Sequence, residues 1–172
     1  FGTWDADRIA NYEISQGRMR EAILVAVPNG NAYGSDRLFE YLPDGDSITN
    51  YGGQGLNFTG RSSLYLQWML TNLAPALDFN YRTLGGPDDT VTAGSSMGGL
   101  VSDYIGFNRP DRFGTVGIFS PAYWAATNYI NSRTLAQQAL RRWISMGTAE
   151  SSSGESSANV YWQGALAAYD GY

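Results

Sequence analysis

Three residue types with special chemistry are missing from this sequence of 172 residues: cysteine, histidine and lysine. Without cysteine, the chain can form no disulfide, no thiolate metal site and no cysteine nucleophile. Without histidine, it lacks the commonest metal ligand and the commonest general base. All eleven basic residues are arginines, which excludes Schiff-base chemistry and a phosphate-binding P-loop lysine. We therefore expect no metal ion and no cofactor, and few residue types are available for catalysis.

Positive charge and long apolar runs are also scarce. The net charge is −5 and the isoelectric point is about 4.5, so nucleic acid is repelled at long range. No apolar run approaches the roughly 18 residues that a membrane span requires. We expect one globular domain that binds neither nucleic acid nor membrane. Its location is left open, with a preference for the extracellular side.

Short apolar runs alternate with helical patterns along the chain. Runs bounded by turn residues predict strands at 21–28 and 90–94, and within 114–121 and 142–147. Periodic apolar residues predict helices at 5–16, 62–77, 97–108, 130–141 and 160–169. In the second of these helices the expected apolar stripe consists of Leu64, Trp68, Leu70, Leu73 and Leu77.

The alternation of strands and helices predicts an α/β fold with a mostly parallel sheet. The run 21–28 is almost continuously apolar, which is typical of a strand buried on both faces. Residues 29–60 are rich in glycine, asparagine, aspartate and tyrosine and predict a long surface loop beside a site. The serine-rich stretch 151–157 predicts a solvated connector.

One motif carries chemistry: Gly94-Ser95-Ser96-Met97-Gly98 has the pattern G-x-S-x-G, between a predicted strand and a predicted helix. In such a turn the central serine is exposed in strained backbone, and the small flanking residues let strand and helix approach closely. The start of the helix then offers the Met97 amide to a developing oxyanion. The pattern favours Ser96 as a nucleophile over the alternative, a glycine-rich turn that serves only tight packing.

Four segments resemble, in order and spacing, a known family: Asn80-Tyr-Arg-Thr83, Val91-Thr-Ala-Gly-Ser-Ser-Met-Gly-Gly-Leu100, Pro110-Asp-Arg-Phe-Gly114 and Phe119-Ser-Pro-Ala-Tyr-Trp124. This family is the esterase-D-like putative-esterase branch of the α/β-hydrolases, which includes carbohydrate esterase family 1 and siderophore esterases. The resemblance implies a three-layer α/β-hydrolase sandwich. It also implies that residues 1–172 form one partial domain whose sheet is truncated at both ends.

The resemblance also assigns site residues. It matches Ser96 to the nucleophile and Met97 to the residue whose amide is one oxyanion donor. Glu150, in Gly147-Thr-Ala-Glu150, matches the acid of a catalytic triad; the alternatives are a surface or capping role for Glu150, with Asp170 as the rival acid. Tyr123 and Trp124 match a segment near the site and are expected to line an acyl pocket, although ordinary packing is the alternative.

The sequence departs from the family pattern in two places. The family carries its histidine on a loop after one further strand, and it has earlier strands and a second oxyanion amide; none of these is in the sequence. We therefore expect missing segments or a partner chain to complete the fold, a degenerate protein being the alternative. The implied function is a serine hydrolase of carbohydrate-linked or other small carboxylic esters. The alternatives are acyl transfer to a sugar and a non-catalytic binding or assembly module.

Overall fold

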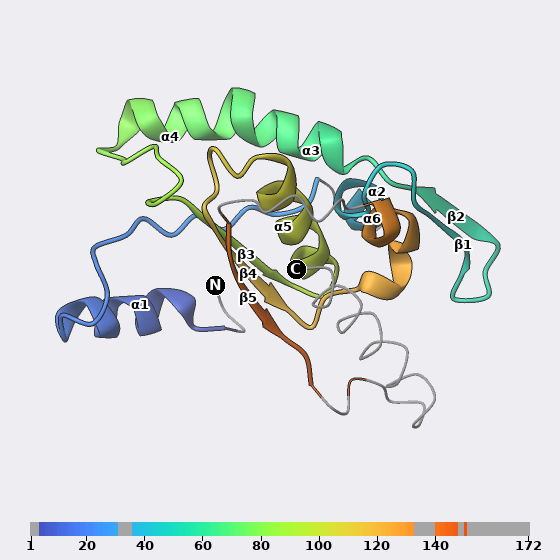
Figure 1. Cartoon of the computed structure of the whole chain (residues 1–172), viewed down its shortest axis with the longest axis horizontal. Helices are drawn as coiled ribbons and strands as arrows, with labels where there is room; N and C mark the ends of the chain where they lie inside the picture. The colour runs from blue at the N-terminus through green and yellow to red at the C-terminus, as the bar shows by residue number, and fades with distance from the viewer. Residues whose placement is uncertain (1–3, 31–35, 133–139, 148–149, 151–172) are drawn as a thin grey trace.

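The computed structural model describes residues 4–30, 36–132, 140–147 and 150. Its centre is a parallel sheet of three strands in the order β3-β4-β5, with bounds Val91–Ser95, Thr115–Phe119 and Arg141–Ser145 (Figure 1). The helix α5, Met97–Asn108, connects β3 to β4. The predicted strands 90–94, 114–121 and 142–147, the predicted helix 97–108 and the α/β fold are therefore confirmed.

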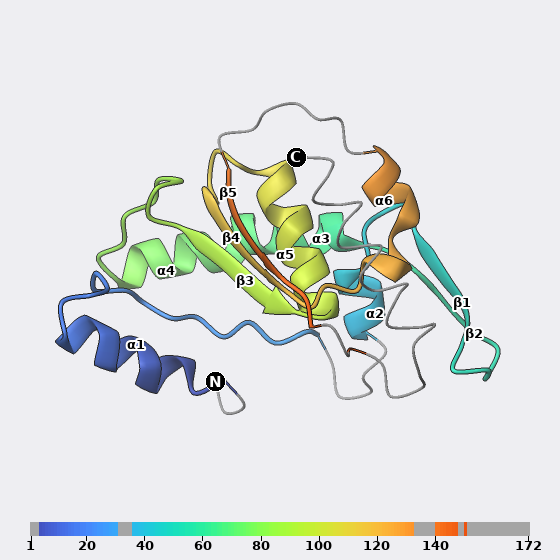
Figure 2. The same cartoon turned by 60° about the horizontal axis from the view of Figure 1, so that its bottom comes forward.

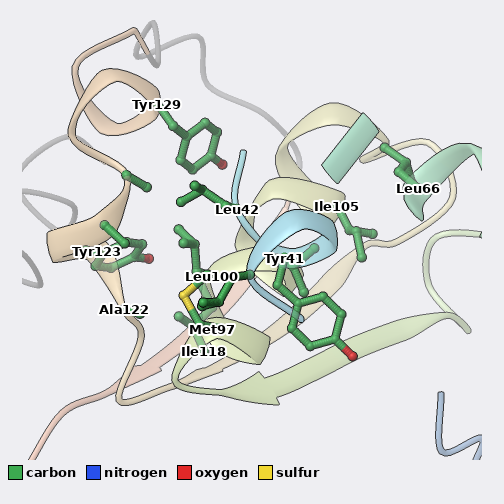
Figure 3. Close-up of a cluster of buried hydrophobic side chains, with 14 of the residues drawn as sticks. Tyr41, Leu42, Leu66, Met97, Leu100, Ile105, Ile118, Ala122, Tyr123 and Tyr129 are labelled. Atoms are coloured by element: carbon green, nitrogen blue, oxygen red, sulfur yellow. The ribbon is translucent and has the colours of Figure 1, made fainter. Parts of the chain in front are cut away.

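The face of the sheet under α5 contains the core. Leu100 and Ile105 of α5 pack with Val116 and Ile118 of β4, and all four side chains are almost completely buried (Figure 3). Close approach depends on Gly106, because a Cβ there would overlap a methyl group of Val116. The apolar sequence of α5 thus brings it onto the middle strand of the sheet.

A longer helical segment lies over α5 (Figure 1). It consists of α3 (Ser62–Trp68), the π-helical turn η1 (Met69–Leu73) and α4 (Ala74–Asn80), so the predicted helix 62–77 is confirmed and extends further. The predicted apolar stripe is partly wrong, because Leu64 and Trp68 are exposed whereas Leu66 enters the core. Leucines on two faces of this helix fit the helical period of about 3.6 residues, so the sequence alone does not decide which face is buried. The elements that pack against the helix decide it.

Residues 29–60 are not the loop that the sequence predicts. They contain α2 (Asp36–Tyr41) and an antiparallel hairpin of β1 (Ser47–Tyr51) and β2 (Leu56–Thr59). Ile48 pairs with Phe58 in this hairpin, and both side chains are buried. The glycine-rich composition that indicated a loop supplies the hairpin turn, where Gly52, Gly53 and Gly55 have positive φ angles.

The predicted strand 21–28 is also wrong. Residues 20–29 form neither strand nor helix, and Ile23, Leu24 and Val25 are exposed. Two contacts fix the ends of this segment: Arg20 forms an ion pair with Asp89 at 2.9 Å, and the Gly30 N–H donates to Glu40 at 2.8 Å. The segment passes along the β3 side of the sheet (Figure 2). A ladder needs a hydrogen-bonding neighbour, and no strand of the described ranges pairs with this segment.

The opposite face of the sheet has little cover among the described residues. The helix α1, Ala6–Ser15, confirms the predicted helix 5–16, and Trp4 just before it contacts the ring of Phe119 edge-on at 5.5 Å. Val91 and Trp143, which project from the same face, are exposed. Within the part of the chain that the structure describes, no helix is long and apolar enough to cross a membrane.

Of the predicted helix 130–141, the structure describes residues 130–132 and 140–141. The helix α6, Thr127–Ser132, begins earlier, and Arg141 already belongs to β5, so the predicted helical end at residue 141 is wrong. Residues 141–145 pair with β4 in parallel register, and this pairing makes them a strand even where the sequence favours a helix. The predicted connector 151–157 and the predicted helix 160–169 lie outside the described residues.

A buried carboxylate fastens α6 to the rest of the molecule. Asp46 is only 3% exposed, and its two oxygens accept the backbone N–H groups of Asn128 and Tyr129 at 2.8 and 2.9 Å. These are the second and third residues of α6, whose N–H groups have no partner within the helix. Asp44 does the same for α3 through Ser63, but from an exposed position.

We expect Asp46→Ala to lower the free energy of unfolding by about 2–3 kcal/mol, because it leaves the buried N–H of Tyr129 and the partly buried N–H of Asn128 without a charged acceptor. The matched control is Asp44→Ala, for which water can replace the lost acceptor and a loss of about 1 kcal/mol or less is expected. Urea denaturation of both variants measures the difference. Equal losses would show that the burial of Asp46 has no energetic consequence.

Candidate active site

Ser96 lies where the chain turns from β3 into α5. Its φ of 59° and ψ of −124° are unusual for any residue except glycine, and its side chain is exposed. The backbone is held on both sides: the Ser96 N–H donates to the Phe119 carbonyl at 3.0 Å, and the Ser96 carbonyl accepts from Ala122 at 3.1 Å. The predicted strained turn with an exposed central serine is present, whereas the chemical role of Ser96 stays a prediction.

The two glycines of the motif differ in their steric environment. A Cβ at Gly94 would overlap the backbone carbonyl of Gly98, the second residue of α5, so only glycine allows the strand and the helix to approach this closely. A Cβ at Gly98 would meet nothing within 4 Å. The steric requirement of the motif therefore falls on Gly94.

Met97 is the first residue of α5. Its side chain is 3% exposed and points into the core beneath the turn (Figure 3). Its N–H belongs to the first turn of the helix, where the backbone N–H groups lack intrahelical partners and the helix dipole is positive. Met97 thus anchors the turn through its side chain, and the role of its amide as an oxyanion donor stays a prediction.

Neighbouring strands end at one edge of the sheet, and the residues that follow these strands in the chain form the candidate site. Ser96 follows β3 directly and Ser120 follows β4 directly, while Glu150 lies a few residues beyond β5. Parallel strands bring their carboxyl ends to the same edge, which is where ligands bind in open α/β sheets. Ser120 also has a positive φ, 42°, and its N–H donates to the Ser145 carbonyl at 2.6 Å.

The carboxylate of Glu150 is held by two donors. Its Oε1 atom accepts the Ser120 hydroxyl at 2.7 Å and the Gly147 N–H at 2.6 Å. The structure thus brings the predicted acid to the end of β4, the strand next to the one that leads into Ser96. The rival acid, Asp170, lies outside the described residues, and the catalytic role of Glu150 stays a prediction.

The two predicted pocket residues have different environments in the short 3₁₀ helix η2, Tyr123–Ala125. Tyr123 is 3% exposed, and its hydroxyl donates to Asp103 at 3.0 Å within the core. The expectation that Tyr123 lines an acyl pocket is therefore corrected: its ring packs beneath the site. Trp124 is 39% exposed and stays the candidate for contact with substrate.

Sequence reasoning missed Asp103 and Ser120. Asp103 is completely buried in α5, accepts the Tyr123 hydroxyl and lies 4.0 Å from the Arg142 Nε atom of β5. It therefore connects three elements that lead to the site. A single acid within the apolar sequence of α5 was a usable signal, because a fully buried carboxylate is rare unless it is paired. For Ser120 the sequence has no comparable signal, because its role depends on a residue thirty positions away.

Comparisons with known proteins agree on the family and the fold. The family model described as "Putative esterase" matches residues 1–168. Uncharacterized protein YbbA of Bacillus subtilis is 28% identical over 142 residues, which are 78% of this chain and 52% of that protein. The chain thus spans about half the length of this curated relative.

Two solved structures have a similar fold. The siderophore hydrolase EstA from Aspergillus nidulans has a TM-score of 0.55 at 17% identity, over 79% of this chain and 50% of that one. The enterobactin esterase FES from Shigella flexneri, in the presence of enterobactin, has a TM-score of 0.54 at 24% identity, over 65% and 29%. At these identities the similarity shows the α/β-hydrolase type of fold, as the family resemblance implies.

The steric difference between Gly94 and Gly98 predicts different changes in the free energy of unfolding when each is replaced by alanine. Gly94→Ala should lower the free energy of unfolding by about 2–4 kcal/mol, because the new methyl group overlaps rigid backbone. Gly98→Ala, the matched control, should be neutral or stabilising by up to about 1 kcal/mol, because alanine favours a helix over glycine. Urea denaturation of both variants distinguishes them. Similar effects at both positions would contradict the packing described for the turn.

Proposed function

Since the chain belongs to the putative-esterase family, we propose that it supplies the nucleophile and the acid of a serine carboxylic-ester hydrolase, Ser96 and Glu150. One observation carries this proposal above all. An exposed serine with strained backbone stands at the end of β3, at the edge of the sheet where a held carboxylate follows β5. Backbone strain of this kind is retained at functional sites.

In the proposed reaction the Ser96 Oγ atom attacks the ester carbonyl carbon, and a histidine accepts its proton. The Met97 N–H stabilises the oxyanion of the tetrahedral intermediate. The carbon–oxygen bond to the alcohol then breaks, the alcohol leaves with the proton, and water hydrolyses the acyl-serine. Glu150 orients the imidazole and stabilises its charged form. Because these 172 residues contain no histidine, the proposed mechanism takes its base from another segment or a partner chain. The family resemblance implies that the second oxyanion amide also comes from there.

The proposed substrates are carbohydrate-linked or other small carboxylic esters. The family resemblance supports this class, and the exposed ring of Trp124 offers an aromatic surface on which a sugar or an acyl group can stack. The names of the solved relatives add siderophore esters to the substrates worth testing. A panel of acetylated xylan, feruloylated sugar and a siderophore lactone would rank these classes by kcat/KM. Product analysis with an added sugar acceptor would detect acyl transfer.

The absence of histidine favours a second candidate, a non-catalytic binding or assembly module. Such a module has no use for a strained, exposed serine. A fluorophosphonate probe separates the two candidates when it is applied to the folded product of the full reading frame. Covalent labelling at Ser96 supports the esterase, and no labelling supports the binding module.

We expect Ser96→Ala, in the product of the full reading frame, to abolish hydrolysis of a p-nitrophenyl ester and labelling by the probe. The free energy of unfolding should change by less than about 1 kcal/mol, because the exposed hydroxyl is not packed in the core. Ester assays and urea denaturation on the same samples test both halves. Retained activity would exclude Ser96 as nucleophile, and a large loss of stability would mark it as structural.

Glu150→Gln should lower kcat by a factor on the order of 10³–10⁴ with little change in KM, because the amide cannot stabilise an imidazolium. Glutamine has nearly the same shape as glutamate and keeps one acceptor oxygen, so the side-chain contacts and the fold should persist. Asp170→Asn is the matched control and should leave kcat close to that of the parent. The reverse result, with Asp170 essential and Glu150 dispensable, would move the acid to Asp170.

A further inference from the structure

We propose that Ser120 is a positioning residue for the reaction: together with the Gly147 N–H it fixes Oε1 of Glu150, so that Oε2 is the atom that orients the catalytic base. This inference rests on the proposed function of Glu150 and goes beyond it, because it assigns a task to each carboxylate oxygen. It also gives a function to a residue that lies outside the serine motif.

The hydrogen bonds carry the assignment of the two oxygens. A carboxylate oxygen has two lone pairs, and those of Oε1 are taken by the Ser120 hydroxyl at 2.7 Å and the Gly147 N–H at 2.6 Å. Donors to an ionised acceptor form the stronger class of hydrogen bonds. Two of them on one oxygen fix the position of the carboxylate and leave the acceptor capacity of Oε2 for an imidazole N–H.

The backbone of Ser120 is itself held for this purpose. Its N–H donates to the Ser145 carbonyl of β5 at 2.6 Å, and its φ is 42°. Glycine adopts this conformation without the strain that a side chain brings. The chain nevertheless has serine here, and the hydroxyl of that serine makes its hydrogen bond to Glu150. The strain is thus accompanied by a contact that glycine could not make.

Gly147 provides an independent handle on the same carboxylate. A Cβ at this position would lie 2.5 Å from Oε1 of Glu150, the far end of a flexible side chain. Gly147→Ala would therefore displace the carboxylate rather than the backbone. A change that moves Glu150 at little cost to the fold separates positioning from stability.

The test measures kcat, KM and the thermal midpoint in the product of the full reading frame, with a p-nitrophenyl ester as substrate. Ser120→Ala and Ser120→Gly should each lower kcat by about tenfold at nearly unchanged KM, as expected for the loss of one charge-assisted hydrogen bond. Their thermal midpoints should differ, because only glycine relieves the positive φ. Ser120→Thr, which keeps the hydroxyl, should recover most of kcat. Gly147→Ala should lower kcat to a similar extent with a midpoint close to that of the parent.

A double variant gives the readout that a purely structural role would not move. In the Glu150→Gln background, adding Ser120→Ala should lower kcat no further, because the residue acts through the carboxylate. An equal loss in both backgrounds, or Ser120→Ala and Gly147→Ala with kcat within about twofold of the parent, would overturn the proposal. If Ser120→Ala fails to fold, Ser120→Gly and Gly147→Ala carry the same test.

The result also distinguishes this inference from the proposed function. If Ser96→Ala is inactive and Ser120→Ala is fully active, only the positioning role of Ser120 is contradicted. An active Ser96→Ala variant removes the serine mechanism itself, and the positioning role of Ser120 falls with it.

Discussion

The contact on which most of this structure depends is the closure of the turn at Ser96 against the segment that follows β4. The Ser96 N–H and carbonyl bond to Phe119 and Ala122, so the turn and that segment fix each other. Gly94 makes the closure possible, because its missing Cβ admits the backbone of Gly98. The arrangement lies where the β3–β4 ladder ends, at Ser95 opposite Phe119, and where α5 begins, at Met97.

The acidic composition has a structural use in addition to its effect on partners. Acids outnumber arginines by sixteen to eleven, and several of the described carboxylates accept main-chain N–H groups. Asp44 and Asp46 hold the first turns of two helices, Glu40 holds Gly30, and Glu150 holds Gly147. In a chain with few cations, backbone amides serve as the positive partners. The contacts of Asp46 join segments more than eighty residues apart, whereas Glu150 and Gly147 are three residues apart.

Sequence reasoning succeeded where local pattern and tertiary context agree. The strands β3 to β5 and the helix α5 were predicted closely because apolar runs, glycines and helix signals coincide there. It failed at 21–28, where an apolar run has no pairing neighbour among the described residues, and at 29–60, where a hairpin turn has the composition of a loop. Among site residues, Ser96 has a local motif, whereas Ser120 and Asp103 act through partners that only the fold brings near.

The two serines with positive φ angles, Ser96 and Ser120, give the chain an evolutionary signature. At both positions glycine is the conformationally relaxed choice, so a change from serine to glycine would relieve backbone strain at each of them. A lineage that no longer used this edge of the sheet would gain stability by that drift, and nothing in the backbone would resist it. Glycine at both positions is therefore the substitution expected in a lineage in which this edge of the sheet carries no chemistry.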